Sequence, residues 1–103
     1  MAVEILHEGM LRIAPADREA EQLGSGYGGM TGPAEGPVWI REKGHLLFSD
    51  IHASKRYRYT PGEGITLDKD GTANGNGQTR DGEGRLIVCP HFSRCVDAED
   101  LET

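Results

Sequence analysis

The sequence predicts an all-β fold made of antiparallel four-stranded meander blades, with one complete and one partial blade of a β-propeller. The first observation behind this prediction is a series of short apolar strands separated by polar turns, in a chain with 15 glycines and five prolines among 103 residues. The second is that the strand pattern begins again after about 40 residues, which is the repeat length of a propeller blade.

Four strands are expected in the first blade, which covers residues 35–70. Residues 38–40 are a short apolar strand, and residues 45–51 form a second strand that is apolar on both faces and therefore buried. In the third strand, residues 55–60, tyrosines alternate with arginines, as in a half-exposed strand. A tight Pro-Gly turn then leads to a fourth, outer strand over residues 65–67.

A second copy of the pattern makes residues 71–103 a partial blade that ends in an acidic tail. Residues 76–81 stand 41 positions after 35–40, and residues 84–90 echo 44–50 at an offset of 40. A ring needs about four to eight blades, so we expect a fragment or a subunit that must assemble.

The two ends of the chain are expected to lie outside the blades. Residues 1–34 are interpreted as an extended lead-in and a glycine-rich loop; over residues 17–23 the pattern leaves a helix and extended structure equally open. The glycine-rich run lacks the Lys-Ser/Thr ending of a phosphate loop and is interpreted as a connection. The last seven residues carry four carboxylates and no cation, which predicts a solvated, frayed end.

Composition excludes several classes of function. A net charge of −6 without a long basic cluster argues against a nucleic-acid partner. A mean hydropathy of −0.54 and the lack of a long apolar run argue against a transmembrane helix and a membrane role. Cys89 and Cys95 are too few for a disulfide scaffold, so we expect a cytoplasmic protein with free thiols, with Cys89 packed in its apolar strand.

Three residues are candidates for a site. Glu35 lies at the start of the first strand of the first blade. In a propeller the innermost strand of each blade lines a central channel. Glu35 is therefore either a surface carboxylate or an anchor for a hard cation in that channel. Asn76 occupies the corresponding place in the second copy and either caps an Asn-Gly turn or contacts a ligand. His91 follows a strand of the second copy and is either a loop histidine or a channel residue, and His52 poses the same alternative in the first copy.

The chain resembles the gluconolactonase/regucalcin (senescence marker protein) family. The resemblance rests on Ala34–Trp39 (AEGPVW), Leu46–Ile51 (LLFSDI) and Arg56–Arg58, continues through Ala73–Asp81 and Gly84–His91, and covers nearly all of residues 3–96. Pro90 departs from the family's Cys-Glu-His segment, and Cys95 replaces one of its arginines.

The resemblance implies a six-bladed propeller that binds one divalent cation, with Ca²⁺ as the first expectation and Zn²⁺ or Mn²⁺ as alternatives, and that hydrolyses sugar lactones. It places Glu35 as the first metal ligand and Asn76 and His91 near the substrate pocket, while the other metal ligands come from later blades. We therefore expect the amino-terminal part of a metal-dependent sugar lactone hydrolase, inactive alone.

A rival hypothesis is a non-catalytic propeller fragment that associates with itself or with a partner. Open blades expose strand edges, and such edges invite pairing with another chain. A stand-alone small β domain that binds sugar is a third possibility.

Overall fold

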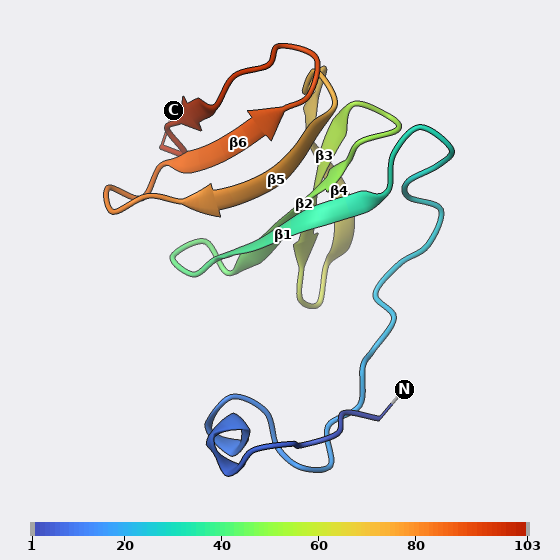
Figure 1. Ribbon diagram of the computed structural model, residues 1–103, viewed down its shortest axis with the longest axis vertical. Coiled ribbons are helices and arrows are strands. Elements are labelled where there is room, and N and C mark those ends of the chain that lie inside the picture. Colours follow the sequence, from blue (N-terminus) through green and yellow to red (C-terminus); the bar gives the residue numbers. More distant parts are fainter. Residues whose placement is uncertain (1, 103) are drawn as a thin grey trace.

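The computed structural model describes residues 2–102, and over this range it contains seven strands and one short 3₁₀ helix (Figure 1). The first sheet has the sequential order β1 (Ala34–Ile40), β2 (His45–Asp50), β3 (Lys55–Thr60) and β4 (Gly64–Asp70). The second has the order β5 (Gly75–Arg80), β6 (Leu86–Pro90) and β7 (Asp97–Glu99). Every pairing between neighbouring strands is antiparallel, which confirms the predicted all-β meander class.

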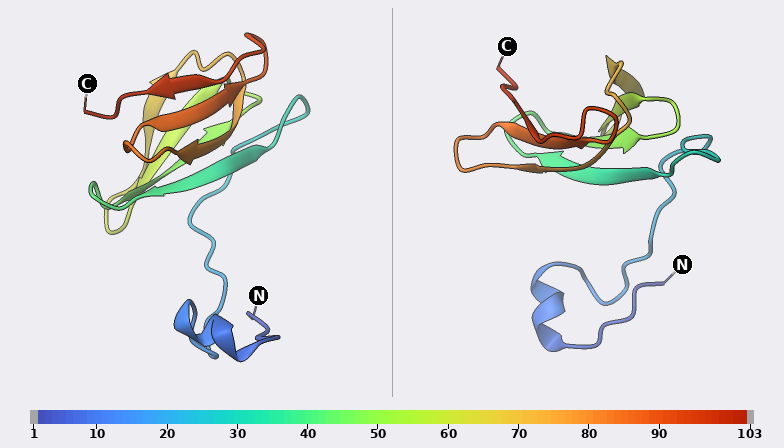
Figure 2. Two further views of the ribbon diagram at one scale, coloured as in Figure 1. Left: turned by 60° about the vertical axis from the view of Figure 1, so that its left-hand side comes forward. Right: turned by 45° about the horizontal axis from the view of Figure 1, so that its top comes forward.

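The two sheets pack against each other through a small apolar core. Ile40 and Leu47 of the first sheet and Leu86 and Val88 of the second are buried and form one cluster. Because alternate residues of a strand point to opposite faces, Leu86 and Val88 of β6 both lie in this layer and Ile87 between them does not. The inner strands β1 and β5 contact each other at this interface, and the views in Figure 1 and Figure 2 show them side by side.

The opposite face of the first sheet carries an aromatic cluster. Tyr27, from the glycine-rich segment, packs edge-on against Phe48 and Tyr57 with ring centroids 5.2 and 4.8 Å apart. Such edge-to-face contacts stabilise beyond the area that they bury. The glycine-rich run is therefore a connection that leads to β1 and places Tyr27 against the first sheet.

The amino-terminal segment differs in part from the extended lead-in that the sequence predicted. Glu8–Arg12 form the 3₁₀ helix η1, which begins after His7; the Nδ1 atom of His7 accepts a 3.0 Å hydrogen bond from the Gly9 amide. Residues 17–23 are not helical. This segment lies apart from the sheets (Figure 2). None of the helical structure in residues 2–102 is long and apolar enough to cross a membrane.

The strand ladders correct the alignment of the two repeats by one residue. Glu35 pairs with Ser49 in the first sheet, and Gly75 pairs with Pro90 in the second. Because the inner strands end at Ile40 and Arg80 and the next strands begin at His45 and Leu86, the inner strands correspond at an offset of 40 and the next strands at 41, the reverse of the sequence expectation. The cause is a turn between β5 and β6 that is one residue longer than the turn between β1 and β2. Asn76 thus corresponds to Gly36 rather than to Glu35.

Two further expectations for the second sheet are wrong. The acidic tail is not a frayed end, because Asp97–Glu99 form β7 and pair with β6. Cys89 is exposed rather than packed, because its neighbours Val88 and Pro90 point to the buried face and Cys89 points away from it. Both cysteines are free thiols.

Candidate active site

The inner strands of the two sheets start next to each other and share an irregularity. The pairing of β1 with β2 shifts between Glu35 and Val38, and the pairing of β5 with β6 shifts between Gly75 and Gln78. Such bulges redirect side chains and are common beside active sites. They bring two of the sequence-predicted residues, Glu35 and Asn76, to the same end of the blade pair.

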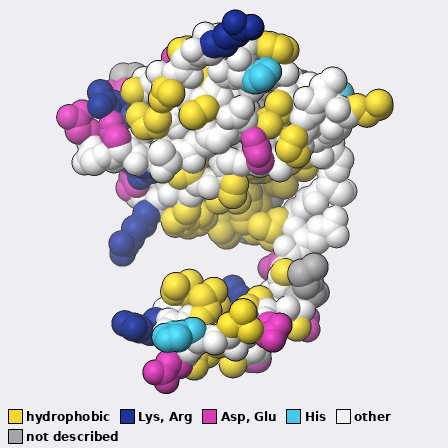
Figure 3. Space-filling view, in the orientation of Figure 1, with side chains coloured by type: hydrophobic (Ala, Val, Ile, Leu, Met, Phe, Trp, Pro, Cys, Tyr) yellow, Lys and Arg dark blue, Asp and Glu magenta, His cyan; other side chains and the backbone are white. Residues whose placement is uncertain are grey.

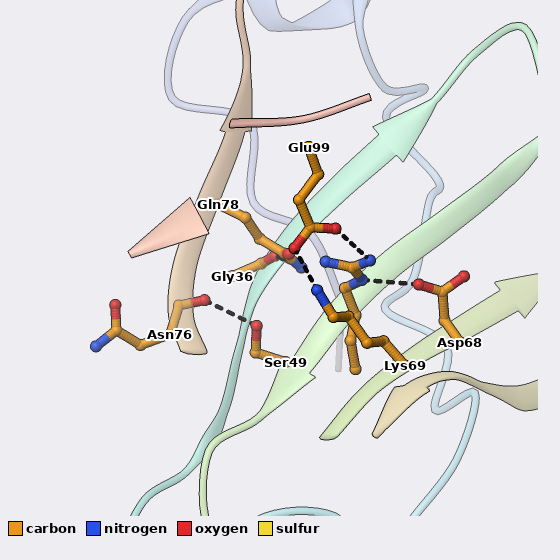
Figure 4. A network of polar contacts seen from close by, with 8 residues as sticks. Gly36, Ser49, Asp68, Lys69, Asn76, Gln78 and Glu99 are labelled. Atoms are coloured by element: carbon orange, nitrogen blue, oxygen red, sulfur yellow. Dashed lines mark hydrogen bonds and ion pairs between the residues drawn. The ribbon is translucent and has the colours of Figure 1, made fainter. Parts of the chain in front are cut away.

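Two hydrogen bonds join the blades at this end (Figure 4). The Ser49 hydroxyl donates to the backbone carbonyl of Asn76 at 2.8 Å, and the Nε2 atom of Gln78 donates to the carbonyl of Gly36, also at 2.8 Å. Gly36 has a φ of +65°, and a Cβ atom there would collide with the Asn76 carbonyl. Glycine is therefore required for both the conformation and the close approach.

An open groove of about 430 Å³ lies at this end of the blades. Its lining is mixed apolar and polar and consists of Thr31, Gly32, Pro33, Ile51, Asn74, Asn76, His91 and Phe92. The structure thus brings Asn76 and His91 into one groove. Glu35 is exposed and does not line the groove itself, but it follows the lining residue Pro33 by two positions.

The groove side chains offer several polar contacts. The Oδ1 atom of Asn76 accepts a 2.6 Å hydrogen bond from the Gly77 amide, which leaves the side-chain NH₂ group to donate to a ligand. His91 is exposed, and its ring lies 5.6 Å from that of Phe92. His52 contacts the hydroxyl of Thr31, a groove-lining residue, at 2.6 Å.

The donor set suits a hard cation only in part. Glu35 supplies a carboxylate, the type of oxygen ligand that Ca²⁺ prefers. Within residues 2–102, however, no group of three or more His, Cys, Asp or Glu side chains is arranged to hold a metal ion.

An ion-pair network links the first sheet to β7 (Figure 4). Arg56, only 5% exposed, donates to Asp68 at 2.7 Å and to Glu99 at 2.9 Å, and Lys69 also donates to Glu99 at 2.9 Å. Burial raises the pKa of Glu99, but the hydrogen bonds and charges of Arg56 and Lys69 outweigh burial and bring this pKa below its usual value. The network therefore holds an ionised Glu99 against the first blade.

Sequence reasoning missed the residues that hold this end together. Ser49 and Gln78 act through backbone carbonyls, and nothing in their local sequence indicates a partner 27 or 42 positions away. Phe92 was missed as a groove residue, although an aromatic residue directly after His91 was a usable signal.

Comparisons with known proteins agree with this architecture. The family model described as the SMP-30/gluconolactonase/LRE-like region matches residues 33–102. No curated protein matches the chain.

Two solved structures are similar. The gluconolactonase XC5397 from Xanthomonas campestris is 28% identical, with a TM-score of 0.62 over 67% of this chain and 23% of that protein. A candidate gluconolactonase from the Northeast Structural Genomics Consortium is 19% identical, with a TM-score of 0.67 over 90% of this chain and 34% of that protein, and shows the fold alone. The chain thus spans a quarter to a third of the structures that it matches. Because the family model covers more than half of the sequence and the sheets have the blade arrangement, this chain belongs to the SMP-30/gluconolactonase/LRE-like family of β-propellers.

Proposed function

We propose that this chain supplies the first blade and part of the second blade of a divalent-metal-dependent sugar lactone hydrolase. The observation that carries the proposal is the juxtaposition of the starts of β1 and β5. The bonds from Ser49 and Gln78 hold Glu35 and Asn76 at one end of the blades, beside the groove that also contains His91. The family membership supports lactone hydrolysis as the chemistry.

Glu35, Asn76 and His91 have different roles in this proposal, each set by the chemistry of its side chain. Glu35 would anchor a divalent cation, which when bound would supply Lewis-acid polarisation of a lactone carbonyl and of an attacking water. The NH₂ group of Asn76 would donate to a sugar hydroxyl, and the His91 ring would hydrogen-bond another. The groove volume of about 430 Å³ lies within the usual range for small-molecule pockets.

We expect this chain alone to bind calcium weakly and to be inactive. Ca²⁺ takes about six to eight oxygen ligands, and Glu35 supplies one carboxylate. In this proposal Ca²⁺ is the first choice of metal, Zn²⁺ and Mn²⁺ are alternatives, and the other ligands come from further blades. The first assay is glucono-1,5-lactone hydrolysis by the 103-residue chain with each metal added. Turnover that disappears in Glu35→Ala would contradict the expected inactivity.

A chimera tests the active-site assignment directly. Residues 33–102 replace the matching segment of the Xanthomonas gluconolactonase, and the chimera should hydrolyse lactone in a chelator-sensitive manner. Glu35→Ala in this chimera should lower kcat/KM by about 100-fold or more, because metal stabilisation is worth several kcal/mol. The control is Glu63→Ala, an exposed carboxylate in the turn between β3 and β4. A folded chimera in which both variants remain equally active would refute the role of Glu35.

A second candidate function is self-association through the face of the first sheet that the second blade does not cover and that Tyr27 covers only in part. Trp39 pairs with Leu46 on this face and is 48% exposed, and Leu67 on β4 is also 48% exposed. Figure 3 shows hydrophobic side chains gathered on the side of the sheets that faces the amino-terminal segment. Sedimentation velocity should give a discrete oligomer that Trp39→Lys dissociates and Met30→Lys, at a fully exposed loop position, does not. A monomer at every concentration would exclude this candidate.

A further inference from the structure

The sequence contains two asparagines, Asn74 and Asn76, and each of them is followed by a glycine. Asparagine is a chemically labile residue, and a following glycine exposes it most, because glycine has no side chain to shield its own amide nitrogen. Asn76 lies in β5 and Asn74 directly precedes that strand. Because the two Asn-Gly pairs are chemically identical, their surroundings in the fold decide which of them reacts.

The side chain of Asn76 is folded back on the residue that follows it. Its Oδ1 atom accepts a 2.6 Å hydrogen bond from the Gly77 amide, so the Cγ atom bonded to Oδ1 lies beside that amide nitrogen. Both residues lie in the bulge of β5, between the paired positions Gly75 and Gln78. Within residues 2–102, and apart from its chain neighbours, no atom lies within 4 Å of the place where a Cβ atom of Gly77 would stand. Asn76 also lines the open groove, where water reaches it.

The pair formed by Asn74 and Gly75 is held differently. Gly75 is buried, and its amide donates a 3.0 Å hydrogen bond to the carbonyl of Thr72. A Cβ atom on Gly75 would lie 3.3 Å from that carbonyl oxygen and from the side chain of Val88. The Asn74 amide is fixed as well, by a 3.0 Å hydrogen bond to the Ser54 hydroxyl. Attack by the Gly75 nitrogen would have to break its bond to Thr72 and move packed backbone, so this pair is protected.

We propose that Asn76 is a site of spontaneous deamidation and that the fold protects Asn74 from the same reaction. The Gly77 nitrogen loses its proton to a hydroxide ion and attacks Cγ of Asn76. A bond forms between these two atoms, the bond from Cγ to Nδ2 breaks, and Nδ2 leaves as ammonia after taking a proton from water. Water then opens the resulting succinimide ring. Opening at Cγ gives aspartate, and opening at the backbone carbonyl gives isoaspartate, in which the chain continues through Cγ.

Deamidation changes both the groove and the joint between the blades. Either product removes the NH₂ donor of Asn76 and adds one carboxylate, which only accepts hydrogen bonds. Isoaspartate also lengthens the backbone of β5 by a methylene group and turns the carbonyl that accepts the Ser49 hydrogen bond into a free carboxylate. This modification goes beyond the proposed lactone chemistry, and mass spectrometry detects it without metal or substrate.

The first test compares the two asparagines within one peptide. The chain, folded by circular dichroism, is incubated at mildly alkaline pH and digested with trypsin, and fragment-ion mass spectrometry assigns each exchange of NH₂ for OH to Asn74 or Asn76. Asn76 should react about tenfold faster, the factor expected from the buried hydrogen bond that Gly75 would have to break. In urea, which unfolds the chain, the two rates should converge. Equal rates in the folded chain, or a faster reaction at Asn74, would overturn the proposal.

The second test uses a matched pair of glycine variants. Gly77→Ala should lower the deamidation rate of Asn76 by about tenfold, because the added methyl group crowds the attacking nitrogen. The fold has room for it, since the place of its Cβ atom is open and Gly77 does not have a left-handed φ. Gly82, in the turn after β5, shares both properties, and Gly82→Ala should leave the rate unchanged. An unchanged Asn76 rate in a folded Gly77→Ala variant would refute attack by the Gly77 nitrogen.

Discussion

The hydroxyl of Ser49 in β2 donates a 2.8 Å hydrogen bond to the backbone carbonyl of Asn76 in β5. This bond ties the second strand of one blade to the inner strand of the next, at the end where Glu35 and the groove lie. Ser49 is 3% exposed, so water does not readily replace it as the donor.

Ser49→Ala should therefore lower the free energy of unfolding by about 1–2 kcal/mol, the cost of leaving a buried carbonyl without its donor. Urea denaturation checks this value. Ser25→Ala, in the exposed glycine-rich segment, should change it by less than about 0.5 kcal/mol. Equal effects of the two substitutions would show that the bond to Asn76 contributes nothing.

Gly36→Ala should destabilise more than Gly44→Ala. The two glycines have nearly the same φ, +65° and +67°, so both substitutions carry a left-handed penalty of about 1–2 kcal/mol. Only at Gly36 does an added Cβ also meet the Asn76 carbonyl, whereas nothing lies within 4 Å at Gly44. This collision should add about 1–3 kcal/mol in the same denaturation measurement. Equal losses of unfolding free energy for the two variants would contradict this, because they would show that β1 and β5 move apart at Gly36 without an energetic penalty.

Arg56→Met should destabilise by about 3 kcal/mol, because it leaves the partly buried carboxylates of Asp68 and Glu99 without their main partner. Arg41→Met, at an exposed turn position, is the control and should change stability by less than about 0.5 kcal/mol. Thermal and urea unfolding of both variants measure the difference. A loss below 1 kcal/mol for Arg56→Met would mean that the network does not hold β7 in place.

Stability should fall in acid partly through Glu99. Its pKa is lower in the folded chain than in the unfolded chain, so the unfolded chain binds the proton more readily. The stabilisation is therefore complete above the unfolded pKa of about 4.3 and is lost as the pH falls through the lower folded value.

Tm profiles from pH 7 to pH 3 test this coupling. Glu99→Gln should be less stable than Glu63→Gln at pH 7, and the two should converge in acid. Comparing the two variants cancels other titrations, including that of His45, whose pKa is lowered chiefly by burial. A difference that stays constant over this range would contradict the coupling.

The strands of the first blade were predictable because their signals are local. The alternation of tyrosine and arginine predicted β3 at residues 55–60, as observed. The alternation also explains the cross-strand packing, because Tyr57 lies opposite Phe48 on the face that is turned away from the second blade. A longer strand such as β4 extends beyond its apolar part because pairing with β3 continues through polar residues.

The missed features depend on contacts between distant residues. Nothing in the composition of the acidic tail indicates a strand, because Glu99 is held by Arg56, 43 positions earlier. The one-residue shift between the repeats was likewise invisible, because the additional residue lies in a polar turn whose length the hydrophobic pattern does not reveal. At the candidate site the sequence indicated which residues could bind a ligand. It could not indicate that Asn76 and His91 line one groove, because only the folded arrangement of the two sheets brings them together.

The partly exposed Trp39 gives the molecule a built-in optical reporter. It is the single tryptophan of the sequence, and it stands on the face of β1 that the second blade does not cover. Any molecule that settles on this face will withdraw the indole ring from solvent, shift its emission to shorter wavelength and shield it from iodide. Docking of further blades, or of another copy, can thus be followed in unlabelled protein through one fluorophore.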